Sequence, residues 1–134
     1  EIQKEMRENA RFMFEYGHAL HKLHEPELSN KVLKEALKVS GDPMILNIIG
    51  KNEQEMKHYE SAEYWFMRAV HRLPGRIYPY YLLANLYADP SFYRRDKLER
   101  MVQTVLEKEP KIQSTAIKQM RRKARELLKK VPEN

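Results

Sequence analysis

The chain has 134 residues, a formal net charge of +6 and no cysteine, so it is long enough for one domain and cannot form disulfides, thiolate metal sites or cysteine nucleophiles. Its 33% charged and 42% apolar residues suit a soluble helical protein, and no run reaches the roughly 18 apolar residues of a membrane span. The first residue is Glu, and a helical pattern already runs there, so we expect a fragment or a processed chain.

The positive charge is concentrated near the C-terminal end. Up to Pro110 the 17 basic residues balance 17 acidic ones, whereas from Lys111 onward eight basic residues face two acidic ones. The whole excess of positive charge therefore belongs to the last segment.

The first 24 residues are expected to form one helix, because apolar side chains recur at the intervals of three and four residues that a half-buried helix requires. Gly17 interrupts this helix, and a glycine inside a helix costs about 1 kcal/mol relative to alanine. We therefore expect another helix backbone to cross close to Gly17. The residues expected to face inward are Phe12, Met13, Tyr16, Ala19, Leu20 and Leu23.

A second helix is expected from Pro26, since the missing N–H of proline is no loss in the first turn of a helix. Ser40 and Gly41 end it. Asp42 and Pro43 open a third helix, because Asp accepts from free backbone N–H groups and Pro pre-sets φ. The apolar face of the second helix consists of Val32, Leu33, Ala36, Leu37 and Val39.

Four more helices are expected after the third, which ends near Met56. The fourth covers residues 59–72 and is stopped by the Pro-Gly pair that follows. The fifth starts at Pro79 and is broken at residues 89–91, and the sixth covers residues 95–108. Ser114 can cap a last helix that reaches about residue 131.

Three of these helix pairs share one pattern of small and apolar residues. Their second helices and the stops that follow carry residues spaced four, three and five apart, and the leading helices carry Gly17, Gly50 and Ala84 at matching positions. The separations of 33 and 34 residues between the leading-helix positions are typical of tetratricopeptide repeats. The three sets are Ser29, Leu33, Ala36 and Gly41; Ala62, Phe66, Ala69 and Pro74; and Leu98, Val102, Val105 and Pro110.

The predicted fold is therefore all-α: a right-handed tetratricopeptide superhelix of three helix pairs with a C-terminal capping helix. We expect residues 1–134 to form a single domain. The repeats are expected at about residues 10–42, 43–76 and 77–112, with the capping helix at about residues 113–131.

In such a repeat the leading helices line a concave groove. Aromatic rings, amides and cations on this wall suit an extended peptide or a helix of a partner protein. The alternative is that these residues are merely the exposed sides of their helices. Phe14 and His18 occupy the positions where carboxylate-clamping repeats have Lys and Asn, so that clamp is not expected. The predicted groove residues are Arg11, Phe14, His18, His21, Asn47, Lys51, Gln54, Tyr78, Tyr81 and Asn85.

Two other constellations carry competing interpretations. His18 and His21 share a helix side and could ligate a metal, but Glu15 is the only near carboxylate, so no metal site is predicted. The last helix could contact anionic lipid or another protein, or it could be a solvated capping surface. Nucleic acid is not expected as a partner, because no aromatic residues are interleaved with the Lys and Arg residues of this helix. The predicted basic patch consists of Arg121, Arg122, Arg125 and Lys129.

No arrangement of residues supports catalysis or a cofactor. The chain has no glycine-rich phosphate loop, no Ser–His–acid set that can be placed and no carboxylate pair in a recognisable cleft.

The segments GRIYPYYLLANLYADPSFY (residues 75–93) and VLEKEPKIQSTAIKQMRR (residues 105–122) are similar to the C-terminal tetratricopeptide region of bacterial O-antigen ligase/polymerase-like membrane proteins. Shorter pieces, namely YG at 16–17, SNKVL at 29–33 and DPM at 42–44, resemble that region too, so the resemblance covers about residues 9–130. It implies a non-catalytic appendage on the periplasmic side of a cell-envelope glycan enzyme, whose catalytic residues lie in membrane loops outside this chain.

The sequence thus predicts a protein-interaction scaffold without enzymatic activity, attached to an envelope glycan ligase. The first alternative is a domain that docks on membrane or glycan-lipid phosphates through its basic last helix. A stand-alone enzyme is the second alternative, and a membrane-spanning segment upstream of Glu1 would remove it.

Overall fold

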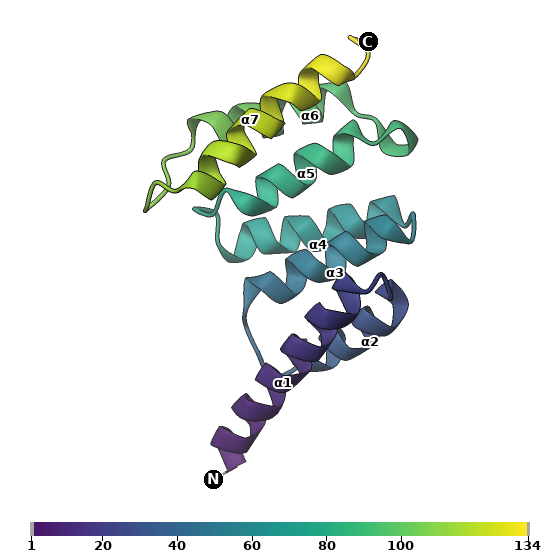
Figure 1. Ribbon diagram of the computed structural model, residues 1–134, viewed down its shortest axis with the longest axis vertical. Helices are drawn as coiled ribbons and strands as arrows, with labels where there is room; N and C mark the ends of the chain where they lie inside the picture. The colour runs from purple at the N-terminus through teal and green to yellow at the C-terminus, as the bar shows by residue number, and fades with distance from the viewer. Residues whose placement is uncertain (1, 134) are drawn as a thin grey trace. The chain divides into compact units, whose positions relative to one another are not determined.

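The structure, a computed structural model, describes residues 2–133 and the side chains of residues 4–133, and this part of the chain is all-helical with no strand (Figure 1). The all-α prediction is confirmed, while the expected helix start at Glu1 lies outside the described residues. The chain divides into two compact units, one ending at Trp65 and one beginning at Phe66. The helices are α1 (Ile2–Lys22), α2 (Pro26–Leu37), α3 (Pro43–Glu55), α4 (Tyr59–Arg72), α5 (Tyr78–Ala88), the 3-10 helix η1 (Pro90–Phe92), α6 (Arg95–Glu107) and α7 (Thr115–Lys130).

The helix boundaries follow the local signals of the sequence. Pro26 is the first residue of α2, and the Asp42 side chain accepts a hydrogen bond of 2.9 Å from the backbone N–H of Met44 at the start of α3. The Ser114 hydroxyl accepts in the same way from Ile117 N–H at the start of α7. The two capping residues are therefore confirmed as helix starts.

The turns that end α1 and α3 have the same backbone geometry. His24 and Lys57 both lie in the left-handed region, with φ of 59° and 65°. After α1 the N–H of residue 25 donates to Leu20 and that of His24 to His21; after α3 the N–H of residue 58 donates to residue 53 and that of Lys57 to residue 54. Each bond in one turn has its counterpart 33 residues later, so the two turns repeat one motif.

The core of the first unit lies between α1, α2 and α3. Its fully buried centre is formed by Leu33, Ala36, Ile45, Ile48 and Ile49, with Met13, Phe14, Leu37 and Trp65 packed against it. At Gly17 a methyl group would come within 2.6 Å of Leu33, and the Gly17 carbonyl accepts a hydrogen bond of 2.6 Å from the Ser29 hydroxyl. The expected close crossing at Gly17 is confirmed.

Several apolar residues expected to face inward are exposed instead. Helix α1 carries two apolar stripes, and the first unit covers only the one that includes Met13, Gly17 and Leu20. Val39 is exposed because α2 already ends at Leu37. The uncovered stripe of α1 contains Phe12, Tyr16, Ala19 and Leu23.

The second unit packs α6 and α7 against α5. Leu83, Leu98 and Val105 are fully buried in it, and Ala124 is the buried residue of α7. The expected break after α5 is the turn in which the Asp89 carboxyl accepts from the N–H of Ser91 before η1.

The helical residues of the repeat pattern are buried alike in each helix pair. Each of the nine second-helix positions is at most 1% exposed, and Gly17, Gly50 and Ala84 on the leading helices are buried too. The sequence register therefore matches the observed burial. The nine positions are Ser29, Leu33 and Ala36; Ala62, Phe66 and Ala69; and Leu98, Val102 and Val105.

Candidate functional site

One side of α1 carries a continuous stack of three rings. The ring centroids of Phe14 and His18 are 6.0 Å apart, and those of His18 and His21 are 6.5 Å apart, with nearly parallel planes in both pairs. Arg11 precedes the stack, and its Nε donates to Glu15 Oε1 at 3.2 Å. The four predicted groove residues of α1 are thus brought together on one side of the helix.

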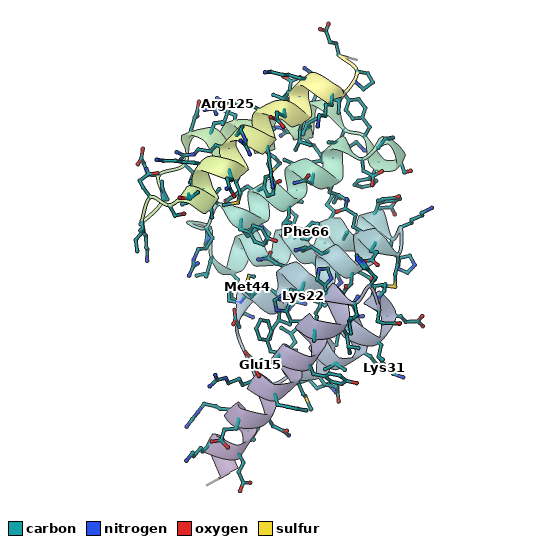
Figure 2. The ribbon with its side chains drawn as sticks, viewed as in Figure 1. Glu15, Lys22, Lys31, Met44, Phe66 and Arg125 are labelled. Carbon is teal, nitrogen blue, oxygen red and sulfur yellow. The ribbon has the colours of Figure 1, made fainter. Side chains whose placement is uncertain are left out.

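The electrostatic surroundings of this stack are positive. Burial lowers the pKa of His18, and the charges of Lys22, His21 and Lys51 lower it further, in that order. Lys22 lies at the end of α1 (Figure 2), whereas Lys51 comes from α3. A lowered pKa favours the neutral imidazole, which can pack as a ring or exchange one hydrogen bond.

Helix α3 also carries a buried amide, one helical turn before Lys51. Asn47 is only 4% exposed, although the sequence pattern predicted it on an open groove wall. Its Nδ2 donates to the sulfur of Met44 at 3.7 Å, a weak acceptor, and its Oδ1 has no hydrogen-bond partner among the described residues. Leaving a buried carbonyl oxygen unpaired costs on the order of 1–3 kcal/mol, so this atom needs an explanation.

A shallow hollow of about 400 Å³ adjoins the stack. Arg11 and Phe14 border it from α1, and the segment that links α2 to α3 borders it from the other side. Lys51 and Gln54 are partly exposed further along α3. Within the first unit the predicted groove residues therefore lie on two helices, and of these residues Arg11 and Phe14 border the hollow.

Polar side chains of α2, α3 and α4 form a buried hydrogen-bond network that was not predicted from the sequence. Asn52, with no exposed surface, donates from Nδ2 to Ser29 Oγ and to Asn30 Oδ1, both at 2.8 Å. Asn30 donates in turn to Glu53 Oε2 at 3.3 Å. Glu53 Oε1 accepts from Ser61 Oγ at 2.7 Å, and Glu53 Oε2 also lies 3.3 Å from Nδ1 of His58. The network connects α2, α3 and the first turn of α4 through side chains alone.

This network fixes the hydrogen-bonding role of His21. Both N–H groups of the Asn52 amide are used, so its Oδ1, which lies 2.7 Å from His21 Nδ1, can only accept. His21 must therefore carry a proton on Nδ1. In the neutral ring Nε2 is then the acceptor, held in a set orientation by a buried partner.

The sequence did contain a signal for this network. Asn52 continues the stripe of Ile45, Ile48 and Ile49 by one more turn, so helix periodicity places it inside. A buried amide must be hydrogen-bonded. Ser29 and Asn30, near the start of α2, are polar residues that can supply these partners.

The remaining predicted groove residues belong to the second unit. Tyr78, Tyr81 and Asn85 are partly exposed on α5. The Asn85 amide donates to the carbonyl of Tyr81 at 3.0 Å, so it is bonded to its own helix.

The predicted basic patch separates into two parts. Arg121 is partly buried and donates to the carbonyls of Val105 (3.1 Å) and Lys108 (2.7 Å), which holds the end of α6 rather than facing outward as expected. Arg122, Arg125 and Lys129 are exposed on α7 (Figure 2 labels Arg125).

The three histidines of the H-x-x-H-x-x-H pattern do not gather at one point. His24 lies in the turn after α1, with its Nδ1 3.4 Å from Glu55 Oε2. In the described part of the chain no three His, Cys, Asp or Glu residues are grouped as a metal site requires.

The comparisons with known proteins do not assign this chain to a family. Neither a scan against protein-family models nor a search of curated proteins found a match to this chain. Of the helices within residues 2–133, none combines the length and apolar character needed to span a bilayer.

Proposed function

We propose that the chain is a tetratricopeptide-repeat interaction module in which α1 and α3 of the first unit bind an extended segment of a partner protein. Three features support the repeat assignment: the matching turns at His24 and Lys57, the equal burial of equivalent positions, and the close crossing at Gly17. Helical repeats of this kind bury their apolar faces by stacking and leave their leading helices for partners.

The observation that carries this proposal is the unpaired Oδ1 of Asn47. A buried oxygen without a donor is a cost in the free chain that a ligand N–H removes. The neighbouring amide nitrogen, Nδ2, donates only to the sulfur of Met44, and Met44 is 40% exposed. Methionine side chains have three rotatable bonds and adapt at low cost, so Met44 can give up its contact with the amide when a ligand binds there.

The other predicted groove residues of α1 and α3, together with Lys22, define the chemistry of the ligand. The rings of Phe14 and His18 offer flat apolar surface, and Lys22 and Lys51 supply positive charge around them. A peptide backbone offers the N–H for Asn47, and an acidic side chain of that peptide complements the charge. We therefore expect an extended peptide with at least one acidic residue.

Replacing Asn47→Leu tests the proposal. The change removes an unsatisfied atom, so the free energy of unfolding is expected to stay the same or to rise by up to about 1 kcal/mol. Binding to an array of short peptides rich in Asp and Glu is expected to fall roughly tenfold, as for one lost hydrogen bond. Stability is read from urea unfolding and binding from fluorescence anisotropy of labelled peptides.

The matched control is Gln119→Leu, an amide that is exposed on α7. It is expected to change neither quantity. If Asn47→Leu binds every peptide as the unmodified chain does, or if the unmodified chain binds none, the groove assignment is wrong.

A second candidate function rests on the exposed bases of α7. Arg122, Arg125 and Lys129 face solvent beside only one acidic residue of that helix, so the helix can dock on anionic lipid or glycan-lipid phosphate. Anionic vesicles are the probe that tests it.

We also propose that the module is a non-catalytic part of an O-antigen ligase-like envelope protein, on the periplasmic side of the inner membrane. The support is the resemblance of residues 75–93 and 105–122 to that region. Sequencing the reading frame upstream of Glu1 tests this placement, since a frame without membrane-spanning segments would exclude it.

A further inference from the structure

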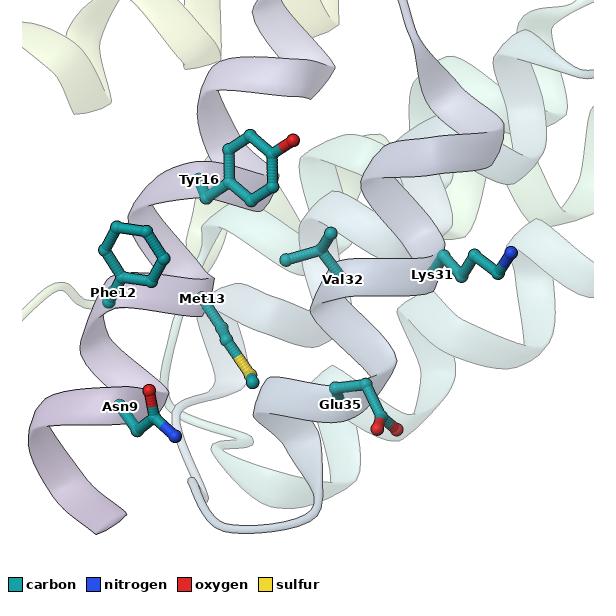
Figure 3. A pocket seen from close by; sticks show the side chains of 7 residues that line it. All are labelled: Asn9, Phe12, Met13, Tyr16, Lys31, Val32 and Glu35. Carbon is teal, nitrogen blue, oxygen red and sulfur yellow. The ribbon is translucent and has the colours of Figure 1, made fainter. Parts of the chain in front are cut away.

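The outer face of the first helix pair carries a groove with two different rims. Figure 3 shows Phe12 and Tyr16 along α1, Lys31 and Glu35 along α2, and Val32 between them. The groove has a volume of about 360 Å³. Phe12 is 65% exposed, and its ring stacks on that of Tyr16 with centroids 6.2 Å apart. This face is distinct from the ring stack on α1, because its aromatic rim, Phe12 and Tyr16, belongs to the uncovered stripe of α1.

The two rims are centred at the same level of the helix pair. Helices α1 and α2 run antiparallel (Figure 1), and Gly17 contacts both Ser29 and Leu33. Position 14 of α1, midway between Phe12 and Tyr16, therefore lies level with about position 34 of α2. The midpoint between Lys31 and Glu35 is position 33. The two midpoints thus agree to within about one residue, or roughly 1.5 Å along the helices.

We propose that this face binds a second copy of the chain about a two-fold axis that crosses both helices at this level. Rotation about such an axis places Phe12 against the partner's Tyr16, and Lys31 against the partner's Glu35. Each contact then occurs twice. This complementarity favours a second copy as the occupant: the aromatic rim meets an aromatic rim, and each charge meets its opposite.

The charges make a second copy a better occupant than an arbitrary apolar helix. Lys31 and Glu35 follow each other at i and i+4, so reversing the direction of α2 exchanges their signs along the rim. Glu35 already lies 2.5 Å from Lys38 at the surface, and an exposed ion pair of this kind is weak. Burial of the Phe12 and Tyr16 rings supplies the apolar contribution.

Sedimentation equilibrium of the full chain over a range of concentrations tests the proposal. The unmodified chain is expected to form dimers. Lys31→Glu and Glu35→Lys are each expected to weaken the dimer roughly tenfold or more, because each places like charges opposite one another twice. The double variant with both changes restores the pairing, and an equimolar mixture of the two single variants forms a heterodimer.

Lys111→Glu is the control for Lys31→Glu, since it makes the same change in net charge on an exposed residue between α6 and α7, far along the chain. It is expected to leave the dimer unchanged, and circular dichroism checks that each variant is folded. A chain that stays monomeric up to about 1 mM overturns the proposal and leaves the face to another segment or another protein. A dimer whose dissociation constant is the same in both charge-reversal variants as in the unmodified chain overturns the proposal as well.

Discussion

Two asparagines of α3 are both buried, and they differ in how their amide groups are satisfied. Asn52 uses both N–H groups and its oxygen in bonds of 2.7–2.8 Å, whereas Asn47 has one weak contact to sulfur and an unpaired oxygen. A fully satisfied buried amide fixes the positions of its neighbours. An unsatisfied one is a cost that binding can remove. The first therefore acts in the fold and the second is the candidate for function.

The residue Asn52 is expected to be essential for the stability of the first unit. Asn52→Leu leaves the hydroxyl of Ser29 and the carbonyl of Asn30 without their buried donor, and it deprives His21 of its acceptor. The free energy of unfolding is expected to fall by about 2–4 kcal/mol, measured by urea denaturation. Nitrogen-15 NMR should also show that His21 loses its preference for the proton on Nδ1.

Gln54→Leu is the control for this prediction, since Gln54 lies on the same helix and is only partly buried. Its effect is expected to stay within about 0.5 kcal/mol. If Asn52→Leu lowers the free energy of unfolding by less than about 1 kcal/mol, the network contributes less to stability than its hydrogen bonds indicate.

At the scale of single helices, the packing of α1 on α2 depends on the absence of a side chain at Gly17. Gly17→Ala gains up to about 1 kcal/mol in helix propensity. The added methyl group would lie 2.6 Å from both Cγ and Cδ2 of Leu33, which is fully buried and cannot move away freely. Overpacking of this kind costs about 1–3 kcal/mol, so we expect a net loss of stability of about 1 kcal/mol by urea denaturation.

Gly75→Ala is a matched control, because no atom lies within 4 Å of a methyl group added there. It is expected to be neutral or slightly stabilising. Combining Gly17→Ala with Leu33→Val should recover part of the loss that the two changes cause separately. If the Gly17→Ala variant is as stable as the unmodified chain, α1 and α2 can move apart to admit the methyl group without loss of free energy of unfolding.

The positions of the helices could be predicted from the sequence, whereas which side of each helix is exposed could be predicted only in part. Caps such as Asp42 and Ser114 act locally, so their effect is readable from neighbouring residues. The inward face of α1 was ambiguous, because Phe12 and Met13 begin two stripes of the same period and periodicity cannot choose between them. The choice is made by where Gly17 lets α2 approach.

The candidate site was predictable to a similar extent. Repeat register placed the rings of α1 on one side correctly, since that depends only on spacing. It could not show that Asn47 is buried or that Arg121 bonds the end of α6, because both follow from side chains of other helices. Long-range contacts of this kind leave no periodic trace.

At the scale of the whole molecule, charge is distributed unevenly along the chain. The first 110 residues are neutral overall and the rest carry the entire +6. Arg121 is bonded to backbone carbonyls of α6 and its end, so an anion would be met by Arg122, Arg125 and Lys129. A test of membrane docking must therefore leave Arg121 intact.

Arg122→Glu combined with Arg125→Glu is expected to abolish binding to vesicles that contain phosphatidylglycerol, because the pair changes the charge of α7 by four units where lipid would be met. Co-sedimentation measures the bound fraction, which for the unmodified chain should fall as salt is raised. The control Arg72→Glu with Arg76→Glu changes net charge equally on exposed residues elsewhere and is expected to keep most of the binding. Equal loss in both double variants would mean that net charge alone, and not α7, attracts the chain to lipid. If the unmodified chain does not co-sediment with anionic vesicles, α7 is excluded as a membrane-docking surface.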